Sequence, residues 1–389
     1  MKLNFSKIIP EEIVHEKRSA DRAFLTVAVT IEYENRIIRG AECRNISTGG
    51  MLVYTDADIP EGAHGTVTLT KKCNNRRYSF SADFEVVRKE IHKVFGPGIA
   101  LKFLHLYEED QRNVEFIVEF HLALSFREKL NINEDDIKDV RFKIAQSKDE
   151  LEQAFSIVHD MYVQEGYMDP QPHGMRISLH HSLPFTTTFI GMVDTDVIIA
   201  STLFLDSVIG LPMDILYKKE LYTLRNSHRL IAEIGAFAVK PGYKNSSTNL
   251  AIHLQKMIVH YTLKYFNLDD LVITIHPKHR MFYKYVFIME QIGPEKYYSS
   301  VNDNPAIAMH SNIRSLEKKL HDSYGTLPPE KNIHDFIFKK ESKCFEWPPL
   351  HAPLIVLNRE LVKYFFEEKT DTFMNTNRDR LNTILDFYK

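Results

Sequence analysis

The sequence has 389 residues, of which 44% are hydrophobic and 26% are charged. This composition is typical of soluble globular proteins and excludes collagen-like, coiled-coil and largely disordered chains. With 49 basic and 52 acidic side chains, the formal net charge of -3 gives no field that would hold a long nucleic acid nonspecifically. At roughly 150 residues per domain, the length predicts two or three domains.

Cysteine usage and hydropathy indicate a compartment. The three cysteines form no CxxC pair, and no stretch reaches the roughly 18 apolar residues of a membrane span. Pro10 and nearby acidic residues interrupt the short apolar patch at the N-terminus, which is unlike an export signal. We therefore expect a cytoplasmic protein with no integral membrane span, while peripheral membrane contact stays open.

Short alternating segments fill residues 23–106 and predict a small β-barrel or sandwich. The segments are FLTVAVTIEY, GMLVYT, GTVTLT, YSFSADFEVV and GIALKFLHL, with turn residues between them. A helix period follows, with apolar residues at Val114, Ile117, Val118 and Leu122. We assign residues 1–125 to this domain. The charged stretch at 126–139 has no apolar period and is interpreted as a linker.

From Val140 onward, predicted strands alternate with predicted helices, which favours an α/β or α+β domain over residues 140–315. Its strands are VRFKIAQS, the paired segments of TTTFIGMVDTDVIIASTLFLDS, IAEIGAFAV and LVITIH, and its helices are KDELEQAFSIVHDMYVQEGY, NLAIHLQKMIVHYTLKYF and RMFYKYVF. Residues 316–389 are predicted to be mostly helical, with interruptions at two Pro-Pro pairs. The fold class is thus multidomain: a small N-terminal β-barrel, an α/β domain and a helical C-terminal extension.

Two arginines precede the first predicted strand, and an NxSxxG motif follows that strand. Arg18 and Arg22 form RxxxR, and Asn45, Ser47 and Gly50 form the second motif. An arginine fork can bind phosphate or the O6/N7 edge of guanine while its flat face stacks on a base. Short polar side chains and a glycine could complete a pocket for a compact, doubly anionic ligand. Taken singly, each piece could equally be a solvated charge or an ordinary turn.

Together, these motifs and the late GIALKF strand with its helix resemble the PilZ domain over about residues 10–125. The resemblance implies binding of cyclic di-GMP as a regulatory ligand. Arg18 and Arg22 would grip guanine edges and phosphates, and Asn45, Ser47 and Gly50 would complete the pocket. Arg44, beside the motif, could assist or could simply be a surface residue.

The segment IAEIGAFAV, a Pro-Gly turn, a long helix and LVITIH resemble the centre of the acetyltransferase-like (GNAT) fold. In that fold two parallel strands splay apart and leave a slot for the pantetheine arm of an acyl thioester. Acyl transfer to an amine needs a base, a polarised carbonyl and a proton for the leaving thiolate. The resemblance suggests Glu233 as the base, directly or through water, and Tyr283 as the proton donor. A structural carboxylate and a packing aromatic residue are the respective alternatives.

One departure from that fold concerns the acyl donor. Coenzyme A-dependent acetyltransferases usually carry a Q/RxxGxG/A loop that cradles the pyrophosphate at a helix N-terminus. Residues 244–249 read KNSSTN and lack glycine. We therefore expect a donor without a diphosphate, such as an acyl group on the phosphopantetheine of acyl carrier protein. Lys240, Lys244 and Lys256 are candidates for a basic patch that would contact this acidic partner.

Further segments, EGYMDP, LDSVIGLPMD and HPKHRMFYKYVF, make residues 140–310 similar to the FeeM-type long-chain N-acyl amino acid synthases, relatives of the acyl-homoserine lactone synthases. The resemblance implies transfer of a fatty acyl chain from acyl carrier protein to the α-amine of an amino acid in a bacterial signalling context. Asp206 and Asp214 would contact the amino group or serve as structural supports.

Other chemistries have little support in the sequence. HPKH contributes His276 and His279 without further ligands at metal-site spacing, so we expect no metal. No GxSxG, GxxxxGK[ST] or GxGxxG motif occurs. A non-catalytic cyclic di-GMP adaptor and an acetyl-CoA-dependent amine acetyltransferase remain the alternatives. Acyl length, acceptor, the sign of regulation and a homodimer stay open, as does the role of the C-terminal extension, which could cover an acyl tunnel, form a dimer contact or pack on its own domain.

Overall fold

The computed structural model describes residues 21–348 and 357–389 and divides into two compact units. Among the described residues, the first unit ends at Leu130 and the second begins at Asn131. Arg18 lies outside the described residues.

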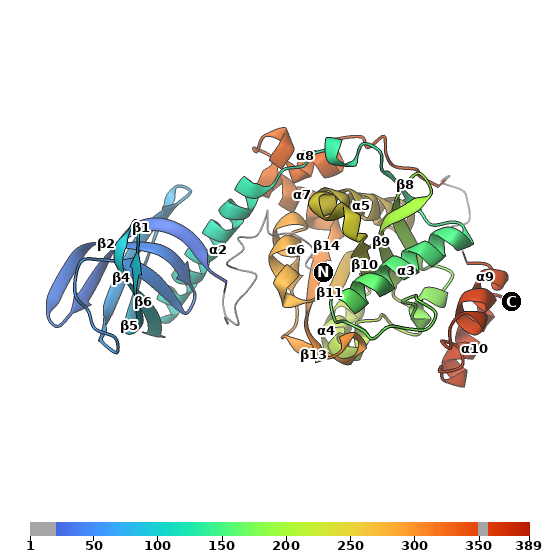
Figure 1. The fold of residues 1–389 in the computed structure, drawn as a ribbon, viewed down its shortest axis with the longest axis horizontal. Coiled ribbons are helices and arrows are strands. Elements are labelled where there is room, and N and C mark those ends of the chain that lie inside the picture. The colour runs from blue at the N-terminus through green and yellow to red at the C-terminus, as the bar shows by residue number, and fades with distance from the viewer. Residues whose placement is uncertain (1–20, 349–356) are drawn as a thin grey trace. The chain divides into compact units, whose positions relative to one another are not determined.

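In its described residues, the first unit consists of antiparallel strands and one long helix (Figure 1). The strands pair in the order β1-β2-β3-β6-β5-β4, and β4 also pairs with β1. The ring is not evenly round, so the sheet-rich character is confirmed while a closed barrel stays a prediction. The elements are β1 (Ala23–Tyr33), β2 (Arg36–Ser47), β3 (Gly50–Tyr54), β4 (His64–Cys73), β5 (Arg76–His92), β6 (Gly96–His105) and α2 (Glu108–Lys129).

Two features of this unit differ from the sequence-based prediction. Strand β2 was missed, because its first half is largely exposed and RIIRGA shows no regular alternation of apolar and polar residues. Helix α2 buries the four apolar residues that the helix period predicted, and also Phe126. Its last turn therefore extends into the segment that we interpreted as a linker.

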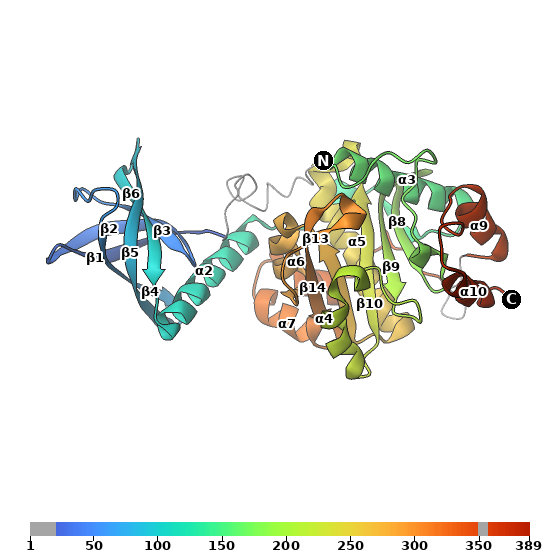
Figure 2. The same cartoon turned by 90° about the horizontal axis from the view of Figure 1, so that it is seen from below.

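The second unit is built around a sheet with the order β12-β14-β11-β10-β9-β8-β7, with β13 paired to β14 (Figure 2). The pair β10–β11 is parallel, and the other pairs are antiparallel. Strand β14 was not predicted from the sequence. The strands are β7 (Arg141–Ile144), β8 (Thr187–Val193), β9 (Asp196–Leu205), β10 (Ile231–Val239), β11 (Asp270–Ile275), β12 (Glu290–Gln291), β13 (Lys296–Tyr298) and β14 (Asn304–Asn312).

Helices α3 (Lys148–Gln164) and α5 (Ser247–Tyr261) cover opposite faces of this sheet. On β8, Ile190 belongs to the same apolar cluster as Phe155 of α3, whereas the neighbouring Phe189 meets the ring of Tyr261 in α5. Successive strand residues point to opposite faces, so the two helices lie on different sides. Burial of both faces explains why β8 and β9 read as continuous apolar runs.

The C-terminal extension packs on its own unit. It contains α7 (Ile313–Tyr324), α8 (Ile333–Phe338), α9 (Arg359–Lys363) and α10 (Arg378–Asp386). Phe345 forms a parallel bridge with Phe142 of β7, and the ring of Phe365 lies edge-on to Phe155, with 5.5 Å between the ring centroids. Of the roles considered for this region, packing on its own domain is the one observed.

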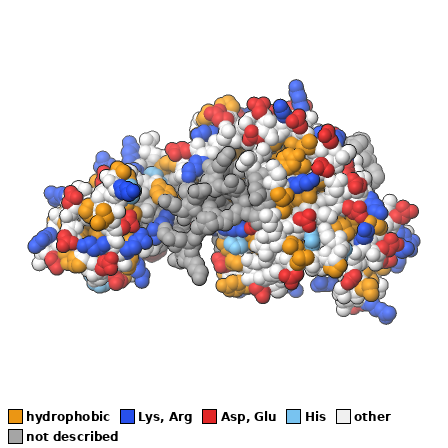
Figure 3. Space-filling model, viewed as in Figure 1, with side chains coloured by type: hydrophobic (Ala, Val, Ile, Leu, Met, Phe, Trp, Pro, Cys, Tyr) orange, Lys and Arg blue, Asp and Glu red, His pale blue; other side chains and the backbone are white. Residues whose placement is uncertain are grey.

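The visible surface carries interspersed basic and acidic side chains (Figure 3), in keeping with the small net charge. Within the described ranges, no helix is both long enough and apolar enough to cross a bilayer.

Candidate functional site

The NxSxxG motif lies at the turn between β2 and β3. Ser47 pairs with Gly50 across this turn, and the buried Ser47 hydroxyl donates a 3.2 Å hydrogen bond to the Gly50 carbonyl. The Oδ1 atom of Asn45 is shielded from solvent and accepts no hydrogen bond from the described residues. A shielded acceptor without a donor is costly, so this atom is suited to a ligand N–H group.

Strand pairing brings Arg22 to the same end of the sheet. Its neighbour Ala23 pairs with Ile46, the residue between Asn45 and Ser47. Arg44 is already engaged: its guanidinium donates to Thr26 Oγ1 at 2.9 Å and to Glu42 Oε2 at 2.6 Å, and lies 4.1 Å from the Phe95 ring centroid.

Gly50 has a structural requirement that the sequence did not reveal. A Cβ at this position would lie 2.3 Å from the Leu101 carbonyl oxygen of the neighbouring strand β6. The close approach of β3 to β6 therefore excludes a side chain at Gly50, independently of any ligand.

The second site begins where β10 and β11 separate. Their parallel pairing covers Ile231–Ile234 and Asp270–Ile273 and stops there, although β10 continues to Val239. The register of β10 with β9 is irregular between Gly235 and Ala238, and Ala236 has a φ of 47°. A cavity of about 470 Å³ opens beside these strand ends, lined by residues of both. The splayed slot expected from the sequence is therefore present.

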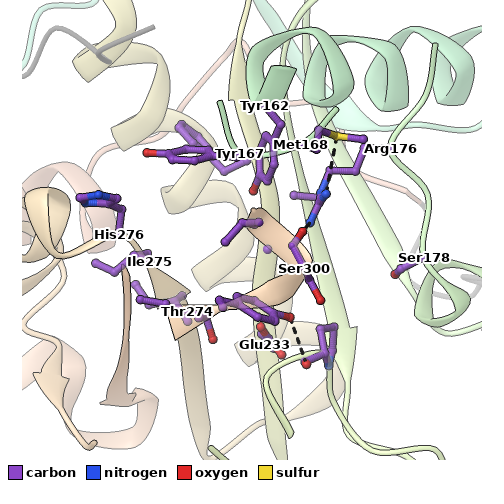
Figure 4. A pocket seen from close by; sticks show the side chains of 18 of the residues that line it. Tyr162, Tyr167, Met168, Arg176, Ser178, Glu233, Thr274, Ile275, His276 and Ser300 are labelled. Carbon is purple, nitrogen blue, oxygen red and sulfur yellow. Dashed lines mark hydrogen bonds between the residues drawn. The ribbon is translucent and has the colours of Figure 1, made fainter. Parts of the chain in front are cut away.

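Glu233 lies at the base of this cavity (Figure 4). Its side chain is 4% exposed, and Oε2 accepts a 2.8 Å hydrogen bond from the Met213 N–H. Burial raises the pKa of the Glu233 carboxyl to about 8, and the Met213 hydrogen bond only partly opposes this shift. A carboxyl with a pKa near neutrality can both accept and release a proton under physiological conditions.

Tyr283, in α6 (Arg280–Val286), also lines the cavity. Burial raises the pKa of its hydroxyl, which therefore stays protonated and able to donate at neutral pH. His276 and His279 line the same cavity, and burial lowers the pKa of His276 to about 4 and that of His279 to about 3. Both imidazoles are neutral near pH 7. No group of three or more potential metal ligands occurs among the described residues.

Asp206 and Asp214 share one partner and do not line the cavity. Arg225 donates to both oxygens of Asp206, at 2.6 and 2.8 Å, and to both oxygens of Asp214, at 2.6 and 2.7 Å. The Leu211 N–H also donates to Asp214, and these hydrogen bonds outweigh burial to lower the pKa of that carboxyl. This geometry favours the structural alternative for both residues.

The first turn of α5 is occupied by protein groups. Asn249 donates through Nδ2 to Asp136 Oδ2 at 2.9 Å, and its Oδ1 accepts from the Asn133 N–H at 3.0 Å. The carboxylate of Asp136 therefore sits beside the helix N-terminus at which acetyltransferases bind the pyrophosphate of coenzyme A.

The predicted basic patch needs a correction. Lys256 is buried, and its Nζ donates to the Lys340 carbonyl at 2.6 Å and to Ser342 Oγ at 2.7 Å. These hydrogen bonds link α5 to the C-terminal extension, and the buried Lys256 is not available to contact a carrier protein. Lys240 is accessible but forms a 3.0 Å ion pair with Asp196. The side chain of Lys244 is not among those that the structure describes.

The polar cavity residues that sequence reasoning missed include Arg176, Tyr298 and Ser300. Arg176 follows α3 in a loop, whereas Tyr298 and Ser300 come from β13 and the turn after it. Arg176 lies more than 100 positions before the other two in the chain, and no local pattern marks any of the three.

Comparisons with known proteins find a different family for each of the two units. Residues 16–120 match the family model of the PilZ domain, and residues 153–312 match that of the N-acyl amino acid synthase FeeM. The chain joins a PilZ domain to a FeeM-like domain. No curated protein matches the chain significantly.

Several solved structures resemble parts of the chain. FeeM from uncultured soil microbes is 27% identical, over 46% of this chain and 94% of that chain, with a TM-score of 0.41. BjaI, a coenzyme A-dependent acyl-homoserine lactone synthase, is 16% identical over 49% and 91% of the respective chains, with a TM-score of 0.36. The PilZ domain of YcgR from Escherichia coli, solved with cyclic di-GMP, is 18% identical over 29% and 97%, with a TM-score of 0.24.

Proposed function

We propose that this protein is a cyclic di-GMP-responsive N-acyltransferase that moves a long-chain acyl group from acyl carrier protein to the α-amine of an amino acid. The observation that carries the proposal is the cavity between the splayed ends of β10 and β11, with the buried Glu233 at its base. An extended acyl-phosphopantetheine arm fits between two such strand ends, because their backbone groups are no longer paired with each other.

In the proposed reaction the acceptor amine attacks the thioester carbonyl carbon. A C–N bond forms, the C–S bond breaks, and Glu233 takes the proton that the amine must lose. Tyr283 gives a proton to the departing thiolate and regains one from solvent. The raised pKa of Glu233 suits a base that works near neutrality, and the raised pKa of Tyr283 keeps its hydroxyl protonated until the thiolate forms.

The donor assignment rests on the first turn of α5. A diphosphate at that turn would meet the Asp136 carboxylate, and like charges at close range repel. An acyl-phosphopantetheine arm on a carrier protein contains a single phosphodiester in place of the diphosphate. The enzyme would recognise the rest of this donor through the surface of the carrier protein. These points support acyl carrier protein over coenzyme A.

The regulatory assignment rests on the PilZ family match and on the motif geometry. Arg22 precedes Ala23, which pairs with Ile46 between Asn45 and Ser47, and no described residue donates a hydrogen bond to Asn45 Oδ1. Arg18 completes the proposed set by its place in the motif. A guanine supplies the N–H groups and a phosphate the charge that these residues would recognise.

The test is product analysis with the purified full chain. We would incubate it with acyl carrier protein carrying a long acyl chain and with the twenty amino acids, with and without cyclic di-GMP, and detect products by mass spectrometry. The proposal predicts N-acyl amino acids whose yield changes with cyclic di-GMP. Faster transfer from the matching acyl-coenzyme A would overturn the donor assignment, and no product from either donor would overturn the enzymatic function.

A further inference from the structure

The lining of the cavity contains one residue with a permanent positive charge. Among the described lining residues, Arg176 is the single lysine or arginine and Glu233 the single acid. Burial lowers the pKa of His180 and His181, as it does for His276 and His279, so these four side chains are neutral. The cavity thus presents a cation to any substrate that enters it.

The Arg176 guanidinium has more N–H donors than it uses in hydrogen bonds to the described residues. Within the described part of the chain it makes two hydrogen bonds, both long: 3.6 Å to Met168 Sδ and 3.3 Å to the Ser300 carbonyl. Its carbon lies 4.4 Å from the Tyr162 ring centroid, so the aromatic face orients the group without using its N–H donors. An arginine has five such donors, and no carboxylate of the described residues forms an ion pair with this one.

Arg176 and Glu233 act on the same region of the cavity. The Tyr298 hydroxyl donates a 3.4 Å hydrogen bond to the carbonyl of Pro212, and the next residue, Met213, donates its N–H to Glu233. Two residues after Tyr298, the Ser300 carbonyl accepts the 3.3 Å hydrogen bond from Arg176. Figure 4 shows Arg176 and Glu233 facing this space from different elements. A substrate that bridges them needs an anionic group and an amine a short distance apart.

From this arrangement we propose that Arg176 binds the carboxylate of the acceptor and so selects α-amino acids over plain amines. The inference rests on the proposed N-acyltransferase function and names the residue that sets its acceptor class. In an α-amino acid one carbon separates the carboxylate from the amine. Bidentate capture of the carboxylate by the planar fork would present the amine to Glu233.

The test compares acceptors that differ only in the carboxylate. We would take the best amino acid from the acceptor screen and the amine formed by its decarboxylation, and measure kcat/KM for both with full-length wild type, Arg176→Gln and Arg176→Lys. We expect the wild type to prefer the amino acid by about 10- to 100-fold, the range for hydrogen bonds to a charged group. Arg176→Gln should bring the ratio close to one, mainly through KM for the amino acid. Arg176→Lys, which keeps the charge and loses the fork, should give an intermediate ratio.

A substitution of an exposed arginine is the control for the Arg176 variants. Arg359→Gln, at an exposed position of α9, should leave the acid-to-amine ratio unchanged. If Arg176→Gln reduced transfer to both acceptors equally, the arginine would hold the loop or the donor phosphate, and the inference would be wrong. A wild type that acylates both acceptors equally would overturn it as well. Transfer to neither acceptor would instead refute the N-acyltransferase function, and this inference with it.

Discussion

The two regions differ in how their residues come together. In the PilZ domain, Arg22, Asn45, Ser47 and Gly50 meet at one end of an antiparallel ladder, within 29 positions of sequence. In the FeeM-like domain, the cavity unites a loop after α3, the middle of β10, the end of β11 and the turn after β13. The first site is a local property of a hairpin, and the second exists only once the whole sheet has formed.

This contrast predicts different responses to substitution. Substitutions in the RxxxR and NxSxxG motifs should affect cyclic di-GMP binding by the first unit. Substitutions in the cavity between β10 and β11 should affect acyl transfer by the second unit.

The largest effect is expected for Glu233→Gln. This change keeps the shape and the acceptor for the Met213 N–H but removes the base, so the acyl-transfer rate should fall by about 10²- to 10⁴-fold. Raising the pH should recover part of the rate, because more of the acceptor amine is then already neutral. Single-turnover kinetics would measure this. Near-normal turnover at pH 7 would exclude Glu233 as the base.

Arg22→Ala should weaken cyclic di-GMP binding strongly. Loss of one partner of a hydrogen-bonded charge pair costs about 2 to 5 kcal/mol, which is well over tenfold in affinity. Calorimetry on the full chain would measure the change, with Arg39→Ala at an exposed position of β2 as the control. Equal affinity of the wild type and Arg22→Ala would refute the role of the RxxxR motif.

Gly50→Ala should destabilise the PilZ domain by about 1 to 3 kcal/mol, the usual range for overpacking. The new methyl group would press on the Leu101 carbonyl, whereas a Cβ at the adjacent Gly49 would meet nothing within 4 Å. Hydrogen exchange at the β3 and β6 amides should accelerate in Gly50→Ala and not in Gly49→Ala. The same protection in both variants would mean that Gly50 is not required by packing.

A further effect concerns stability and pH. Glu233 has a folded-state pKa of about 8 against 4.5 when unperturbed, so the folded protein retains a proton that the unfolded chain releases. Its contribution to stability is complete below about pH 4.5 and is lost as the pH rises through 8. The melting temperature of the wild type should therefore fall, relative to that of Glu233→Gln, between pH 5 and pH 8. A constant difference over this range would show that the carboxyl is not held neutral.

The sequence predicted those parts of the molecule that depend on local patterns. The apolar period of α2, the alternation of β1 and the NxSxxG turn are visible within short windows. Strand β2 was missed because its exposed half carries no regular alternation of apolar and polar residues. Arg176 could not be found, since only the fold brings it into one cavity with Glu233 and Tyr298 of distant strands. Lys256 was misjudged because only the fold shows that the C-terminal extension buries it.

The central claim is that acyl transfer occurs in the space between the ends of β10 and β11, and filling that space tests it most directly. Ile275 lines the cavity, so Ile275→Trp would place an indole where the acyl arm is proposed to lie. Val208→Trp, at a side chain that is 77% exposed, adds the same group outside the cavity. With acyl carrier protein as the donor, transfer by Ile275→Trp should fall on the order of 10²-fold, as for a displaced substrate, while Val208→Trp keeps the wild-type rate and both proteins stay folded. Equal transfer by both variants would place the reaction elsewhere and contradict the account.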